Sequence, residues 1–148
     1  MTGTTETGID PRGPRVGAGI TSVLLIAVIL LGGAAGLVVL AVVVASFALG
    51  AAAGVGRTWQ GALYRSVIQP RLGPPADLED PAPPRFAQAV GLLITAAGLV
   101  LGLLGVTWAP PVFAGVALVA AFLNAVFGFC LGCEMYLLLR RLSRPTVA

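Results

Sequence analysis

The sequence predicts an all-α, polytopic membrane protein with four transmembrane helices in a compact bundle. Hydrophobic residues make up 57% and charged residues 10% of the 148-residue chain, and the mean hydropathy is +0.97. An ordinary soluble domain is about 45–50% apolar and about 25% charged. Apart from Glu134, the charged residues also fall outside the long apolar stretches, which glycines and prolines interrupt. A lipid bilayer is therefore the expected surroundings of most of the chain.

The first half of the chain contains two spans joined by a tight turn. Residues 16–53 are 38 consecutive positions without a charged side chain. As one helix this segment would be roughly 57 Å long, whereas the hydrocarbon core of a bilayer is about 30 Å thick. The chain therefore has to fold back, and the glycine-rich residues 32–36 predict spans over about 16–31 and 36–54. A re-entrant pair that does not reach the far side is the alternative.

A connector, residues 57–85, follows the second span. Three apolar residues lie at four-residue spacing in its first part: Trp59, Leu63 and Val67. This spacing predicts a short helix over 57–69 in the headgroup layer, ending at Pro70, and a plain loop is the alternative. Residues 70–85 hold six of the eleven prolines together with three acidic residues. That composition predicts a stiff, extended, water-exposed segment.

The second half contains another pair of spans, expected over about 86–106 and 111–139, with Trp108 to Pro111 interrupting the apolar sequence. We therefore divide the chain into an N-terminal tail over 1–15, a single membrane domain over 16–142 and a C-terminal tail over 143–148.

Glycines recur at four-residue spacing inside the spans. Such pairs let helices approach closely in lipid, which predicts tight packing within one bundle, with a homo-oligomer as the second option.

The placement of the arginines predicts the orientation. All basic residues are arginines, and they precede the first span, lie in the connector or follow the last span. Because arginines of short loops stay on the cytoplasmic side, we expect a multi-pass protein of the plasma membrane with both termini and the connector in the cytoplasm. A cleaved signal peptide fits poorly, since the residues before the first span carry no net charge. No groove of alternating basic and aromatic residues indicates nucleic-acid binding.

One reactive pair stands out: Cys130 and Cys133, followed by Glu134. The chain has no other cysteine and no histidine, which excludes Ser-His-Asp triads and histidine-bearing metal or haem sites. Two cysteines at this spacing can form a disulfide, exchange electrons with a thioredoxin-like partner or carry a persulfide. A metal shared between two subunits is a minor alternative, and we expect no metal or cofactor in the single chain. The candidate catalytic residues are therefore Cys130, Cys133 and Glu134.

The state of this pair depends on whether the last helix is continuous. In an unbroken helix the two Cβ atoms lie roughly 5–6 Å apart, whereas a disulfide needs about 3.8 Å. A helix running to residue 139 would also place both thiols near its negative end, in low dielectric and beside Glu134, which disfavours the thiolate. The cysteines would then be inert. Alternatively, the helix breaks near Gly128 and restarts, so that Cys130 caps a new N-terminus and Glu134 accepts its proton.

Three further polar residues near the bilayer are weak candidates for substrate binding: Arg85, Gln88 and Asn124. Ionisable or strongly polar groups at membrane depth are functional candidates by default. Each also has a structural interpretation, because Asn124 can join helices by a hydrogen bond and Arg85 can extend to the headgroups. Arg85 can instead pair with Glu134 or attract an anion.

Three segments, residues 9–15, 70–91 and 120–142, closely resemble a bacterial membrane family, domain of unknown function 4395, which is common in actinobacteria. The cysteine pair and Glu134 stand where that family has them. The resemblance implies a small integral membrane protein often encoded near thioredoxin-like proteins and sulfurtransferases. It therefore favours a thiol-redox or sulfur-handling role with such a cytoplasmic partner. A non-catalytic membrane subunit, or a transporter component for a small sulfur-containing anion, is the alternative, and whether the chain is an enzyme stays open.

Overall fold

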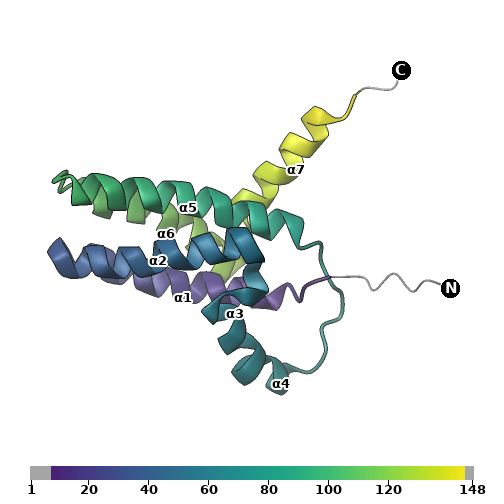
Figure 1. Ribbon diagram of the computed structural model, residues 1–148. Coiled ribbons are helices and arrows are strands. Elements are labelled where there is room, and N and C mark those ends of the chain that lie inside the picture. The colour runs from purple at the N-terminus through teal and green to yellow at the C-terminus, as the bar shows by residue number, and fades with distance from the viewer. Residues whose placement is uncertain (1–7, 146–148) are drawn as a thin grey trace.

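The computed structural model describes residues 8–145 and contains four long helices that pack side by side (Figure 1). They are α1 (Arg12–Leu31), α2 (Gly33–Ala53), α5 (Ala82–Leu103) and α6 (Ala109–Phe127). All four are long and apolar enough to cross a membrane. The predicted fold class, an all-α membrane protein with four candidate spans, is confirmed. Of the expected N-terminal tail, residues 1–7 lie outside the described residues and α1 already begins at Arg12. Residues 146–148 of the expected C-terminal tail also lie outside them.

The turn between α1 and α2 occupies two glycines within the predicted segment. Gly32 and Gly33 have φ angles of +60° and +49°, a region that is open to glycine and strained for other residues. Gly36, four residues after Gly32, lies against the carbonyl of Val28, and an added Cβ at Gly36 would be only 2.9 Å from the carbonyl oxygen. The small residues therefore allow both the sharp reversal and the close approach of the two helices.

The four helices form a ring in which α1 packs against α2 and α6, and α5 packs against α2 and α6. The side chains buried at its centre are Leu25, Val28, Leu40, Val43, Ala114 and Ala117. Three polar side chains inside the spans, Ser22, Ser46 and Thr95, donate to the backbone carbonyl four residues earlier in their own helix. Thr95, which is fully buried, donates its hydroxyl proton to the carbonyl of Gly91 at 2.7 Å. This bond satisfies the hydroxyl where no water is at hand.

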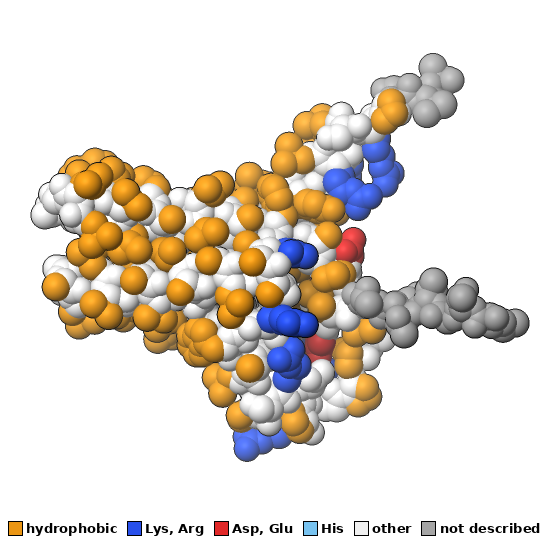
Figure 2. Space-filling view, in the orientation of Figure 1, with side chains coloured by type: hydrophobic (Ala, Val, Ile, Leu, Met, Phe, Trp, Pro, Cys, Tyr) orange, Lys and Arg blue, Asp and Glu red, His pale blue; other side chains and the backbone are white. Residues whose placement is uncertain are grey.

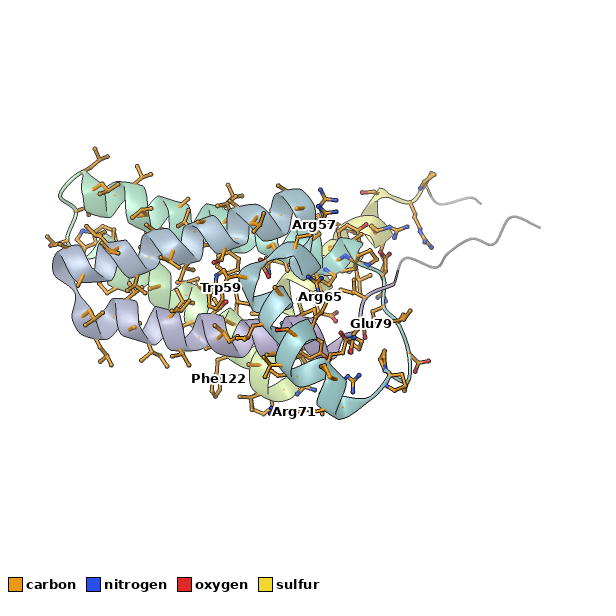
Figure 3. The ribbon with its side chains drawn as sticks, turned by 60° about the horizontal axis from the view of Figure 1, so that its bottom comes forward. Arg57, Trp59, Arg65, Arg71, Glu79 and Phe122 are labelled. Carbon is orange, nitrogen blue, oxygen red and sulfur yellow. A yellow bond between two sulfur atoms is a disulfide. The ribbon has the colours of Figure 1, made fainter. Side chains whose placement is uncertain are left out.

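The first part of the connector is helical and lies at one end of the bundle. It consists of a 3₁₀ turn η1 (Val55–Arg57), α3 (Trp59–Leu63), a π-helical turn η2 (Tyr64–Ile68) and α4 (Gln69–Leu72). The sequence suggested that this helix ends at Pro70, but in the structure the helix continues past this residue. Pro70 lies in the first turn of α4, where its missing N–H breaks no hydrogen bond, and the helix ends at Gly73 with φ +70°. Trp59, labelled in Figure 3, fastens the segment to α2 by donating to Ser46 Oγ at 2.8 Å.

The proline-rich part of the connector is tied to the start of α1. Ile9 and Glu79 exchange two backbone hydrogen bonds of 2.9 Å. Asp10 accepts hydrogen bonds from Arg12 Nη2 at 2.9 Å and from the Tyr64 hydroxyl at 2.7 Å. These bonds, chiefly the one from Arg12, lower the pKa of Asp10 from 3.8 to about 2. Of the segment 70–85 that was expected to be extended, only residues 73–81 are non-helical, because α4 runs to Leu72 and α5 begins at Ala82. This non-helical part is also held against the start of α1.

The single helix expected over 111–139 is two helices in the structure. Helix α6 ends at Phe127, and a separate helix α7 (Leu131–Ser143) leaves the bundle at an angle (Figure 1). The break lies at Gly128, whose φ of +67° is left-handed and open to glycine without strain. The expected span over 111–139 is therefore wrong, and the alternative of a break near Gly128 is correct. The composition alone did not decide between them, because a glycine in a long hydrophobic stretch is also compatible with a continuous helix.

Charged side chains gather at one end of the molecule. In Figure 2 the blue and red atoms lie at the end that carries the connector and α7, and the opposite end of the bundle is hydrophobic or uncharged. Large apolar side chains such as Leu30 and Leu93, 78% and 72% exposed, cover the sides of the spans. A surface of this kind fits lipid around the sides and water at the charged end.

Candidate functional site

The two cysteines form a disulfide at the start of α7. Their Cα atoms are 5.2 Å apart. Cys130 has an extended backbone, with φ −90° and ψ 102°, and its Sγ accepts a hydrogen bond of 3.2 Å from the backbone N–H of Cys133. Of the two arrangements that the sequence left open, the structure has the broken helix, with Cys130 as the N-terminal cap of α7. The distortion that a disulfide requires is therefore built into the chain at Gly128.

Both cysteines are partly exposed, and Glu134 beside them is exposed. Glu134 lies in the first turn of α7, where a negative charge interacts favourably with the helix dipole. Glu134 does not form the ion pair with Arg85 that the sequence left open. The only ion pair among residues 8–145 joins Arg12 and Asp10.

Arg85 is held at the end of another helix. Its Nε donates to the carbonyl of Ala51 at 2.7 Å and its Nη2 donates to the carbonyl of Ala52. Arg15 acts in the same way on α6, where its Nη2 donates to the carbonyl of Val126 at 3.3 Å. In each case the first turn of one helix supplies a cation to the negative end of its neighbour. This use of the guanidinium explains why Arg85 does not reach Glu134.

A cavity of about 1400 Å³ lies at the charged end of the bundle. Its walls come from all four long helices, from α3 and η2, and from the start of α7. Five of the six candidate residues line it: Gln88, Asn124, Cys130, Cys133 and Glu134. The structure thus brings together residues that are up to 46 positions apart in the sequence, and Arg85 is the candidate that it leaves outside.

The disulfide lies against α5 through a glycine. An added Cβ at Gly132, between the two cysteines, would lie 2.6 Å from the Cα of Ala87. One turn further along α7, the ring of Tyr136 packs on Phe86 with centroids 5.6 Å apart. The two contacts hold the first turns of α7 beside the cavity wall.

The structure adds Gln60 to the site, which the sequence did not single out. Gln60 lines the cavity, is 5% exposed, and its Oε1 has no hydrogen-bond partner within the part of the chain that the structure describes. In the sequence it lies on the polar side of the helix expected over 57–69, a position that suggests exposure. Its burial comes from the packing of α3 against the bundle, which no local pattern reveals.

The surface of α7 is divided into two faces. Its exposed apolar side chains are Leu131, Met135, Leu137, Leu138, Leu139 and Leu142. All of them except Leu137 lie on one side of the helical wheel, where most follow a spacing of three or four residues. Arg140 lies on the opposite side of the helical wheel and also rests over the ring of Tyr136 at 5.8 Å. A short basic helix with one apolar face is typical of a segment that lies in the lipid headgroup layer.

A family model described as Domain of unknown function (DUF4395) matches residues 9–141. The matched range contains the four long helices, the connector, the disulfide and Gln60. No curated protein and no solved structure matches the chain. The chemistry of the site therefore has to be inferred from its geometry.

Proposed function

The chain belongs to the DUF4395 family, and from the geometry of its site we propose that it carries out thiol–disulfide exchange at the membrane. The reacting pair is Cys130 and Cys133, and the partner is a thioredoxin-like protein or a sulfurtransferase. The site faces the cytoplasm of a cell whose plasma membrane holds the four spans. The gathering of arginines at the end that carries the disulfide supports this orientation.

One observation carries the proposal: Cys130 is the N-terminal cap of α7, and its sulfur accepts the Cys133 N–H. Once the disulfide is reduced, that N–H and the positive end of the helix stabilise a thiolate at Cys130. Both residues are partly exposed, so a partner's sulfur can reach them. The cysteines therefore combine the two properties of reactive thiols, a stabilised thiolate and access.

The exchange proceeds in two balanced steps. The Cys130 thiolate attacks one sulfur of the partner's disulfide, a bond forms between Cys130 and that sulfur, and the partner's other sulfur leaves as a thiolate. Cys133 then loses its proton and attacks the Cys130 sulfur, which releases the partner's second thiolate. The pair Cys130–Cys133 is oxidised to the disulfide, and the partner gains two electrons as two thiolates. These thiolates take up two protons from water, which balance the proton that Cys130 lost to water on forming its thiolate and the proton that Cys133 gives up. The same steps in reverse reduce the disulfide in the structure. Glu134, adjacent to Cys133 in the first turn of α7, serves as the acceptor of the Cys133 proton.

The test compares two single-cysteine variants of the full chain in lipid nanodiscs. With an aromatic disulfide as probe, the thiol of Cys133→Ser, which keeps Cys130, should react at least about tenfold faster at neutral pH than the thiol of Cys130→Ser. The same Cys133→Ser protein should form a mixed disulfide with a thioredoxin that retains one activated cysteine.

The wild-type disulfide should also be reduced by thioredoxin, which a mass shift after alkylation reports. Two equally slow thiols, together with a disulfide that thioredoxin leaves intact, would contradict the proposal. The cysteines would then be structural residues of a non-catalytic membrane subunit.

A further inference from the structure

One buried polar atom in the cavity lining has no hydrogen-bond partner among the described residues. Gln60 Oε1 is buried and accepts no hydrogen bond, although leaving a buried acceptor unsatisfied destabilises the folded chain. Among the described residues it is the only buried side-chain nitrogen or oxygen in this condition. Because Gln60 lines the cavity, a ligand that brings an O–H or N–H group would restore the missing bond.

Much of the cavity lining is apolar, and the cavity reaches the lipid-facing side of the bundle. Phe47 and Ile94 line it from α2 and α5. Val116 and Val119 on α6 also line it, and they are 53% and 59% exposed on the side of a span. A ligand with a hydrophobic body can therefore enter from the bilayer. The volume of about 1400 Å³ exceeds the roughly 300–1,000 Å³ of usual small-molecule sites, and it accommodates a ring with an attached hydrocarbon chain.

Six charged residues line the cavity, and the exposed ones among them include Arg65, Glu79, Asp80 and Glu134. Asp10 is paired with Arg12, and Arg15 donates to the end of α6. The disulfide lies in the wall of the same cavity. A ligand there is placed beside a group that takes up or gives off two electrons.

We propose that the cavity binds a lipid-soluble quinone and its hydroquinone, whose hydroxyl donates to Gln60 Oε1, and that this carrier exchanges two electrons with the Cys130–Cys133 pair. The inference rests on the proposed function and identifies the quinone as the second redox partner of the cysteine pair. In the forward step the two thiols become a disulfide, giving up two electrons and two protons. The quinone takes up both and becomes the hydroquinone. In the reverse step the hydroquinone returns them, and the S–S bond is cleaved to two thiols.

The binding test uses a protein without redox-active cysteines, so that it does not depend on exchange. In the background Cys130→Ser, Cys133→Ser and Trp108→Phe the remaining tryptophan is Trp59, which is bonded to Ser46 in the cavity wall. The probe is a benzoquinone with a ten-carbon tail, titrated as its mole fraction in nanodisc lipid. Quenching of Trp59 should saturate, and the reduced probe should displace the quinone.

Two variants locate the site. Gln60→Leu should weaken binding of the hydroquinone about five- to tenfold and that of the quinone less, because only the hydroquinone donates to Oε1. Gly17→Leu should abolish saturation, since position 17 lines the cavity and has open space in front of it, with Gln60 Cβ at 3.8 Å as the nearest atom. Ser66→Ala, exposed and outside the lining, should bind as the parent does.

The outcomes separate this inference from the proposed function. Quenching that does not saturate, or that is equal in the parent and in Gly17→Leu, overturns the inference while thioredoxin exchange by the wild-type chain stands. Binding without oxidation of the reduced wild-type cysteines by the quinone overturns the electron-transfer step. Saturable binding together with one hydroquinone formed per disulfide supports the whole inference.

Discussion

Replacing Gly132 with alanine tests how the disulfide is positioned. The new Cβ would lie 2.6 Å from Ala87 Cα and 2.5 Å from Ala87 Cβ, whereas carbon atoms pack at about 3.5–4.0 Å. Both opposing atoms are fixed by the backbone of α5, so no change of rotamer relieves the overlap. Helix α7 has to move by about 1 Å, and overpacking of this kind costs about 1–3 kcal/mol. The higher helix propensity of alanine offsets about 0.5–1 kcal/mol of that cost.

The expected net loss of stability for Gly132→Ala is therefore about 1–2 kcal/mol, measured by denaturant unfolding in detergent micelles. The matched control is Gly115→Ala, because an added Cβ at Gly115 in α6 meets no atom within 4 Å. This control should be neutral or slightly more stable than the wild type. If Gly132→Ala is as stable as Gly115→Ala, the close contact between α7 and α5 does not hold the site, and the argument is refuted.

Arg85→Met should lower stability by about 1 kcal/mol through loss of the cap on α2 while leaving the rate of thiol exchange within about twofold. A loss of exchange at unchanged stability would instead place Arg85 at the thiol site. Asp10→Asn should destabilise the protein by about 1 kcal/mol at pH 7. Because the pKa of Asp10 is lowered from 3.8 to about 2, the stability from its charge is present above pH 4 and is lost as the pH falls toward 2. Denaturation at stepped pH should therefore show the difference from wild type closing over that range, and a constant difference would contradict it. A spin label at Leu138 should collide with oxygen dissolved in lipid, and a spin label at Arg140 should collide with a water-soluble nickel complex. Equal exposure of the two labels to the nickel complex would show that α7 lies in water.

The sequence is enough to predict the fold class because lipid sets the length and the composition of each span, and both can be determined along the chain. Each span needs about 20 apolar residues, and the chain must reverse at residues without side-chain strain. Residues 16–53 satisfy both conditions with a turn at Gly32 and Gly33. The cysteine pair was also evident from the sequence, since its spacing and its neighbour Glu134 are local properties.

The end of α6 was harder to predict, because two continuations of the same apolar segment were compatible with its composition. The left-handed glycine at Gly128 and the donation from Arg15 to the last carbonyls of α6 stabilise the broken form. Arg15 lies about 110 positions away in the sequence. Its contribution therefore exists only once α1 has packed against α6.

Local patterns determined which segments are apolar enough for lipid, where the first two spans turn and which two residues are the candidate thiols. Tertiary packing decided the rest, because burial and the pairing of polar groups depend on which helices become neighbours. It buried the amide of Gln60, directed Arg85 to the end of α2 and placed the disulfide beside a cavity. Each of these results joins segments that are distant along the chain, and a periodicity within one segment carries no information about them.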